Sequence, residues 1–330
     1  MKAGLVADLV CPLSAEPLRL EGEGEAEVET GWLVCDGCGR DWAIRGGIPR
    51  LVPPDLVQQQ QDTASAFGWQ WQHFAEFHPE FEEQFLDWLD PVDRASFAGK
   101  RVLDAGCGTG RHAYLAARFG AREVVALDLS GAVEAARVNL RELDDVHVVQ
   151  GDLLRLPLRT AAQGGGFDLI YSIGVLHHLP DPHAGFLALL PYLRPGGTIA
   201  VWLYGHENNG FVRHAVEPLR RVTTKLPRSA LRAVAWPLAA GFHGLAKGVY
   251  RPLEDTRVGK SLPLDEYMAS VADFSFRQNY GIVFDQLSAP TAAYIKRDEV
   301  EQWFAESGLT DVTISHRHGN SWRGSGRAES

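Results

Sequence analysis

The chain has 330 residues, of which 45% are hydrophobic and 22% are charged, and its net charge is −10. This composition is typical of a globular protein and excludes a disordered or fibrous chain. The longest stretch without a charged residue, Ala233 to Ala246, contains Pro237 and is shorter than the roughly 20 residues of a membrane-spanning helix. No secretory signal is expected, because the N-terminus lacks a basic start followed by an apolar run.

Charge and cysteine usage add two constraints. Residues 1–100 carry 18 acidic and 7 basic side chains, whereas residues 211–260 carry 10 basic and 3 acidic ones. Such asymmetry says more about binding partners than about the fold. The four cysteines have no disulfide-framework spacing, so a cytoplasmic location is expected.

The first two regions of the chain are a small module over residues 1–54 and a helical connector over residues 55–97. In the module, Trp32 to Val34 reads as a strand, and the alternating glutamates between Glu21 and Glu29 fit either a solvated hairpin edge or an exposed loop. In the connector, apolar residues including Phe85 and Trp88 predict an amphipathic helix that ends at Asp90.

Apolar runs then alternate with helical periods over residues 98–204, which predicts βαβ units and a doubly wound α/β fold with a mostly parallel sheet. Strands are expected at 101–104, 123–127, 146–150, 169–172 and 198–203. Residues 205–290 read as a helical insertion. Residues 291–330 complete the sheet, with a helix near 298–307 and a strand near 311–315.

A glycine-rich turn follows the first strand of this region. Asp104 precedes Gly106, Gly108 and Gly110, and a helical pattern begins at Arg111. Glycines at such a turn let a ligand approach the backbone and the helix N-terminus closely. The dinucleotide-binding fingerprint needs its third glycine where Arg111 stands, so the dehydrogenase interpretation is rejected.

The pattern Asp-x-Gly-x-Gly-x-Gly over 104–110 resembles the first motif of class I S-adenosylmethionine-dependent methyltransferases. Phe167 to His178 and Leu193 to Gly197 also resemble motifs of that family, most closely in its ubiquinone and menaquinone biosynthesis methyltransferase-like group. The resemblance is strong over about 98–204 and weak over 291–318. It implies a seven-stranded sheet and S-adenosyl-L-methionine as cofactor.

The same resemblance assigns roles to residues at the ends of later strands. Asp128 would accept hydrogen bonds from the ribose hydroxyls and Asp152 would contact the adenine amino group, with Leu129, Leu153 and Ile173 as neighbouring cofactor contacts. Trp69 lies where relatives place a helix over the cofactor. It or Trp71 could stack near the sulfonium, or both could be packing residues.

Acceptor-side candidates follow strands four and five. His177 and His178 lie at the carboxyl edge of the sheet, where either could act as a general base or could simply pack the loop. Further candidates for lining the acceptor pocket are Tyr204, His206, Asn208, Asn209, residues 284–288 and residues 320–323.

The N-terminal module resembles a small zinc-binding domain related to an activator of tRNA and protein methyltransferases. The resemblance rests on Cys11, on the pair Cys35 and Cys38, and on the segment 48–53. The usual second cysteine is replaced by Ser14, so that three thiolates remain and a zinc ion would need another ligand, for which Asp8 is a candidate. The site is therefore a degenerate one.

Three functions remain open from the sequence. The preferred one is methyl transfer to a small-molecule or lipid-like acceptor, with the insertion as a lid over the acceptor. The second is an RNA or protein methyltransferase, and the third is a non-catalytic regulatory protein that binds the cofactor. The basic segment 211–260 could form the lid, dock on the acidic N-terminal region, or contact a membrane surface or nucleic acid. The oligomeric state is not specified.

Overall fold

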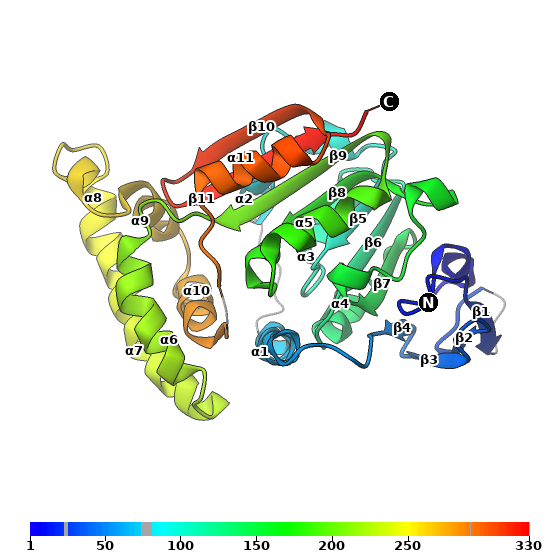
Figure 1. Cartoon of the computed structure of the whole chain (residues 1–330). Coiled ribbons are helices and arrows are strands. Elements are labelled where there is room, and N and C mark those ends of the chain that lie inside the picture. The colour runs from blue at the N-terminus through cyan, green and yellow to red at the C-terminus, as the bar shows by residue number, and fades with distance from the viewer. Residues whose placement is uncertain (23–25, 74–80, 291, 330) are drawn as a thin grey trace.

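In the computed structural model, which describes residues 1–22, 26–73, 81–290 and 292–329, one mixed β-sheet runs through the molecule (Figure 1). Side chains of residues 70–73 and 81 are not part of this description. The described strands number eleven, in the order β1-β2-β3-β4-β7-β6-β5-β8-β9-β11-β10. They are β1 (Arg19–Gly22), β2 (Thr30–Cys35), β3 (Arg40–Arg45), β4 (Ile48–Leu51), β5 (Arg101–Ala105), β6 (Glu123–Asp128), β7 (Val146–Gly151), β8 (Phe167–Ile173), β9 (Leu193–Tyr204), β10 (Thr310–Arg317) and β11 (Ser321–Arg327). The α-helices are α1 (Gln58–His73), α2 (Phe81–Leu89), α3 (Arg111–Arg118), α4 (Val133–Leu140), α5 (Pro182–Leu189), α6 (Glu217–Thr223), α7 (Arg228–Leu245), α8 (Arg251–Leu253), α9 (Asp265–Ala272), α10 (Phe276–Ser288) and α11 (Arg297–Glu306).

Seven of these strands, from β7 to β10 in the sheet order, form the predicted methyltransferase-type sheet. Strands β7, β6, β5, β8 and β9 pair in parallel, and β11 pairs antiparallel with β9 and β10. The doubly wound, mostly parallel, seven-stranded fold is thereby confirmed. The strands expected from the sequence are all present, whereas β11 was not expected as a strand.

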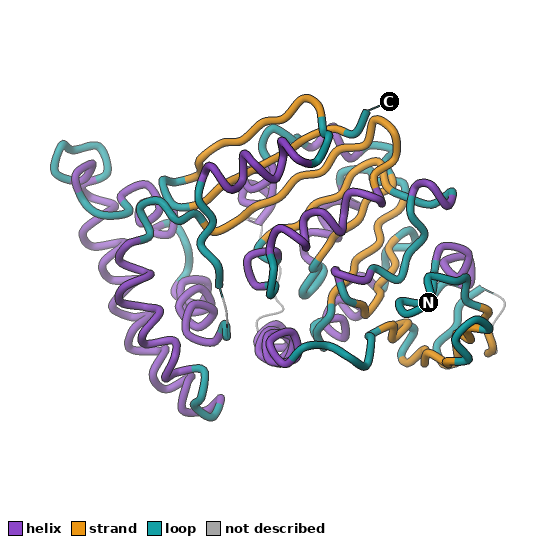
Figure 2. The backbone as a smooth tube through the Cα atoms, in the orientation of Figure 1, coloured by secondary structure: helices purple, strands orange, loops and turns teal. Residues whose placement is uncertain are grey.

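Two hydrophobic cores lie on opposite faces of this sheet. Helices lie on both of these faces (Figure 2). Neighbouring residues of a strand alternate between them, as Leu103 packs in one core and Val102 in the other. Phe186 of α5 and Phe304 of α11 cover the first face, and Phe85 of α2 belongs to the second with residues of α3 and α4. Because both faces are covered, the inner strands are nearly continuous apolar runs.

The N-terminal module extends the same sheet. Strands β1, β2, β3 and β4 form an antiparallel meander, and β4 then pairs in parallel with β7, with Arg50 opposite Gln150. The glutamate-rich stretch belongs to a hairpin at its first strand, since Glu21 pairs with Trp32, while residues 23–25 lie outside the described residues. The module therefore covers what would otherwise be the open edge of β7.

The insertion between β9 and α11 forms a helical layer at the other end of the sheet, far from the N-terminal module (Figure 1). Helices α6 and α7 pack on α10, where Leu231 and Phe284 share a small core. Arg228 at the start of α7 donates to the carbonyl of Ser65 in α1, which ties the layer to the connector. Among the described residues, no helix has the length and apolar character to cross a membrane.

Candidate active site

The glycine turn after β5 adopts a backbone that side chains would not tolerate. Gly106 has a φ of +97°, and a Cβ there would lie 2.2 Å from Cγ2 of Val175. Gly110 has a φ of +81°, and a Cβ would lie 2.6 Å from Cδ1 of Leu140. The turn leads directly into α3, so its backbone and the helix N-terminus face the same space. The local sequence thus builds a close-approach site for a ligand.

Asp128 ends β6 beside this turn and is held rigidly. Its Oδ2 accepts from the backbone N–H of Gly108 at 2.9 Å, and its Oδ1 accepts from the N–H and hydroxyl of Ser130 at 2.8 and 2.7 Å. Because a carboxylate has about four acceptor positions, Oδ2 retains one for a ligand hydroxyl. Burial raises the pKa of Asp128. A carboxylate so fixed suits recognition of a ribose hydroxyl.

Asp152 follows β7 and marks the third strand end of the site. Its Oδ1 accepts from Nε2 of Gln60 at 3.1 Å and from the N–H of Leu154 at 3.0 Å. Gln60 belongs to α1, so the connector helix closes over this end of the site. Leu153 lies beside it and is buried.

Asp104 is the buried acid of the glycine motif. Its side chain is 1% exposed, and Oδ2 has no hydrogen-bond partner among the described residues. Burial raises the pKa of Asp104 to about 8. A buried carboxyl with one unpartnered oxygen, next to a ligand-binding turn, fits a cationic ligand group, such as the ammonium of the methionine part of S-adenosylmethionine.

Replacing Asp104 by Asn should change how stability depends on pH. The folded pKa of about 8 exceeds the ordinary value of 3.8, so only the folded state holds this proton between these values. Stability contributed by the carboxyl is therefore lost as pH rises from about 4 to about 8. As pH rises across this range, the free energy of unfolding measured with urea should fall in the wild type relative to that of Asp104→Asn. Parallel curves for the two proteins would contradict the assignment.

These strand ends line one cavity of about 1260 Å³. Seven of the residues predicted to contact the cofactor belong to its lining, namely Gly106, Gly108, Asp128, Leu129, Asp152, Leu153 and Ile173. Asp104, Gly110 and Trp69, also predicted, are not in that lining as described. The cavity continues from the strand ends to the insertion, where residues of α7, α9 and α10 line its other side.

The two histidines after β8 have different surroundings. His177 is fully buried, stacks on Tyr204 at 3.9 Å between ring centroids, and its Nδ1 faces the N–H of Tyr204 at 3.4 Å. Burial lowers its pKa well below the usual range, so it stays neutral. His178 instead lines the cavity and packs on Phe67 at 4.8 Å. His178 is therefore the candidate that can meet an acceptor.

The structure places Phe67, and not Trp69, in the lining of the cavity. Trp69 packs on Phe284 at 5.5 Å and lies under the guanidinium of Arg228, within the core of the insertion. Phe67, two residues earlier on α1, is the aromatic residue that lines the cavity. The side chain of Trp71 lies outside the described residues. Stacking of Trp69 on the cofactor stays a prediction that this packing does not favour.

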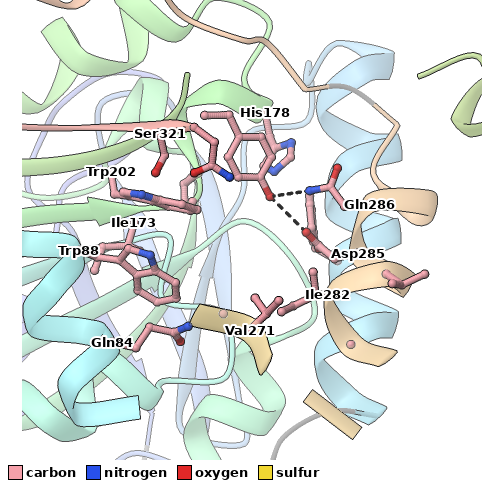
Figure 3. A pocket seen from close by; sticks show the side chains of 18 of the residues that line it. Gln84, Trp88, Ile173, His178, Trp202, Val271, Ile282, Asp285, Gln286 and Ser321 are labelled. Atoms are coloured by element: carbon pink, nitrogen blue, oxygen red, sulfur yellow. Dashed lines mark hydrogen bonds between the residues drawn. The ribbon is translucent and has the colours of Figure 1, made fainter. Parts of the chain in front are cut away.

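A polar cluster faces the cavity from the insertion side (Figure 3). The hydroxyl of Tyr204 donates to Oδ2 of Asp285 at 3.4 Å, and Nε2 of Gln286 donates to the same hydroxyl oxygen at 3.2 Å. Around this cluster, Figure 3 shows Ile282 and Trp202 among the lining residues. A few convergent polar groups in an otherwise apolar wall are typical of a site that orients a ligand.

Of the other residues predicted to line the acceptor pocket, some lie in the cavity lining and some do not. Asn209, Asn320 and Ser321 line the cavity together with Tyr204. Asn208 donates to the carbonyl of Gly319.

The three predicted metal ligands come together in the N-terminal module. The Sγ atoms of Cys11, Cys35 and Cys38 lie within 4.8 Å of one another, and the hydroxyl of Ser14 lies 3.2 Å from Sγ of Cys35. Although burial opposes it, hydrogen bonding by Leu13 and Ser14 lowers the pKa of Cys11 to about 7. Ready ionisation of a thiol in such a triad fits a zinc ion.

Asp8 is not the missing ligand. Its Oδ2 lies 2.6 Å from the guanidinium of Arg101 at the start of β5. The suggestion of Asp8 as fourth ligand was therefore wrong, because the carboxylate is engaged by a buried cation. A zinc ion bound by the three thiolates would have Ser14 or water as its fourth ligand.

Comparison with known proteins agrees with this site. The family model described as "Methyltransferase domain" matches residues 102–197. The ubiquinone biosynthesis O-methyltransferase of Thiobacillus denitrificans is 37% identical over 214 residues, which make up 64% of this chain and 84% of the relative. The chain belongs to the class I S-adenosylmethionine-dependent methyltransferases. The matched residues of this methyltransferase include the glycine turn, Asp128, Asp152 and the histidine pair.

Two further relatives align over shorter parts of the methyltransferase. The ubiquinone biosynthesis O-methyltransferase of Aromatoleum aromaticum is 35% identical over 151 residues, 44% of this chain and 61% of the relative. The trans-aconitate 2-methyltransferase of Deinococcus radiodurans is 43% identical over 128 residues, 38% of this chain and 46% of the relative. The chain thus spans less than two thirds of the length of both, and trans-aconitate, the acceptor named for the second, is a small molecule.

Proposed function

We propose that this methyltransferase transfers a methyl group from S-adenosylmethionine to a small-molecule or lipid-like acceptor by in-line displacement at the methyl carbon. The observation that carries the proposal is the single cavity of about 1260 Å³ that joins the strand ends to the helical insertion. This volume exceeds the upper end of common ligand pockets, roughly 1,000 Å³, and so suits a cofactor together with a second ligand. Its far side is apolar, with Val271, Phe274 and Ile282.

The acceptor would place a hydroxyl or amino group at the polar cluster and its apolar part along the insertion. Asp285 accepts from Tyr204 and lines the cavity as a half-buried side chain, so it can also accept from an acceptor hydroxyl. His178 lines the same cavity and is the second candidate for a general base. When bound, the cofactor supplies an electrophilic methyl group. The protein's own contribution is to hold the acceptor atom in line and to remove its proton.

Labelled methyl transfer tests the proposal. Purified protein and S-adenosylmethionine with a labelled methyl group are incubated with lipid, polar-metabolite, protein and RNA fractions of a cell extract. We expect label in the lipid or small-molecule fraction. Asp285→Asn should lower turnover by about 100-fold or more, with the dissociation constant of the cofactor changed by less than about twofold, because general-base catalysis contributes about 10²–10⁴-fold.

The exposed Asp255, on the same insertion but outside the cavity lining, provides the matched control. Asp255→Asn should leave turnover unchanged. Label confined to RNA or protein would favour the alternative acceptor class. Cofactor binding without any turnover would favour a regulatory protein.

For the N-terminal module the proposal adds a zinc ion held by Cys11, Cys35 and Cys38, with Ser14 or water as the fourth ligand. Cys35→Ala should lose the bound zinc. Ser14→Cys completes a four-thiolate site, so its zinc should resist removal by chelators better than that of the wild type. Unchanged metal content in both variants would refute it. A cytoplasmic location, where these thiols stay reduced, is part of the proposal.

A further inference from the structure

Exposed apolar side chains are concentrated in the insertion. The described residues include fifteen large apolar side chains with substantial exposure, and nine of them lie between residues 211 and 260. These nine are Phe211, Leu219, Val222, Val234, Trp236, Leu238, Leu245, Val249 and Val258. Trp236 is 58% exposed and Val222 is 61% exposed. A cluster of this size on one segment marks an interaction surface rather than ordinary surface variation.

The same segment is strongly basic although the chain as a whole is acidic. It carries ten basic and three acidic residues, against a net charge of −10 for the chain. Its exposed cations are Arg221, Lys225, Arg232, Lys247, Arg251, Arg257 and Lys260, of which Arg251 pairs with Glu254. The acidic N-terminal module lies at the opposite end of the sheet and cannot neutralise them (Figure 1). The described contacts of the segment with the acidic N-terminal region, residues 1–100, lie instead at the connector, where Arg228 donates to the carbonyl of Ser65.

The apolar surface is continuous with the active-site cavity. Of the nine exposed apolar residues, Phe211, Leu219, Leu238 and Leu245 also line the cavity. Val222 and Trp236 are exposed outside that lining. The insertion thus has one apolar side toward the cavity and further apolar groups, mixed with cations, toward the surroundings. An acceptor with an apolar part could pass between the two without crossing water.

We propose that the segment 211–260 docks the methyltransferase on an anionic lipid bilayer and that the acceptor enters the cavity from that bilayer. The cations match anionic headgroups, and Trp236 with the aliphatic side chains would enter the interface between headgroups and acyl chains. Exposed valines and leucines gain nothing from phosphates in water, which favours a bilayer over a nucleic acid as the partner. Only the second part of this proposal, entry of the acceptor from the bilayer, rests on the proposed function.

Flotation with lipid vesicles tests the docking on the full-length protein. We expect binding to vesicles of equimolar phosphatidylcholine and phosphatidylglycerol, about tenfold or more tighter than to phosphatidylcholine alone, and weakened by salt. The double variant Arg221→Glu/Arg232→Glu should lose the preference for anionic vesicles. The double variant Val222→Ser/Trp236→Ser should weaken binding to both vesicle types.

The matched control reverses two exposed arginines elsewhere, Arg118→Glu/Arg141→Glu, with the same change in net charge. It should bind vesicles nearly as the wild type does. Three results would each overturn the docking. They are absence of vesicle binding by the folded wild type, equal losses of binding in the control variant, and salt-sensitive binding to tRNA without binding to vesicles. Vesicle binding is measured without acceptor or turnover, so the docking can be tested even if the proposed methyl transfer is not observed.

Discussion

Asp128→Asn is expected to weaken binding of S-adenosylmethionine by about 10- to 100-fold. Hydrogen bonds to a charged group contribute about 1.5–3 kcal/mol each, and about 1.4 kcal/mol corresponds to a factor of ten in affinity. Asp128 is positioned for such a bond because Gly108 and Ser130 occupy its other acceptor positions. Calorimetry with the cofactor and with its demethylated product measures the loss directly.

Ser130→Ala serves as the graded comparison for this variant. It removes the hydroxyl that donates to Oδ1 of Asp128 but keeps the backbone N–H and the charge. We expect its affinity to fall by less than about fivefold, since a neutral donor is worth about 0.5–1.5 kcal/mol. If Asp128→Asn bound the cofactor as tightly as the wild type, the ribose would have to lie elsewhere.

Gly106→Ala is expected to abolish measurable cofactor binding. The φ of +97° costs a side chain about 1–3 kcal/mol, and the added Cβ would lie 2.2 Å from Cγ2 of Val175. The turn must shift to relieve this clash, and the shift moves the backbone that a ligand approaches. Isothermal calorimetry gives the affinity, and thermal unfolding gives the accompanying loss of stability.

Gly120→Ala separates backbone strain from the clash. Gly120 has a φ of +89°, but its nearest neighbour to an added Cβ is 3.8 Å away and it does not line the cavity. This variant should lose stability and keep its affinity for the cofactor. In the double variant Gly106→Ala/Val175→Ala, part of the affinity should return. Equal affinities in Gly106→Ala and the wild type would show that the turn does not contact the cofactor.

The strand-end residues of the site could be predicted because their signal is local. Asp104, Asp128 and Asp152 each follow an apolar run, and parallel strands bring their carboxyl ends to one edge of the sheet. The glycine turn is recognised just as locally, from the spacing of its glycines, although the side chains that exclude a Cβ there, Val175 and Leu140, come from later elements. For these elements the local sequence pattern is enough to predict the geometry.

Residues that reach the site from distant helices could not be placed in this way. Gln60 and Phe67 lie on α1, and Asp285 lies on α10 more than 150 residues after β6. Their helices show which face is apolar but not which part of the sheet that face meets. Choosing Phe67 over Trp69 depends on how α1 rotates between the sheet and Phe284. That rotation is a tertiary property.

Strand β11 was missed for a different reason. Its sequence, Ser-Trp-Arg-Gly-Ser-Gly-Arg, has two glycines and a single large apolar residue, which is unusual for a strand. The glycines are required by packing, because a Cβ at Gly324 would lie 2.5 Å from Cε2 of Phe304 in α11. The glycines of β11 are thus explained by close packing against α11 and not by strand propensity.

The pairing of β4 with β7 has a consequence for the order of events at the ribosome. Arg50 and Gln150 face each other across a separation of 100 residues, so the first module of the chain lacks its neighbour until β7 has been made. At about 5–20 residues per second, this wait lasts roughly 5–20 s. During that time the unpaired edge of β4 is exposed to other chains. The module that is synthesised first is therefore completed only after β7, which ends at Gly151, has been made.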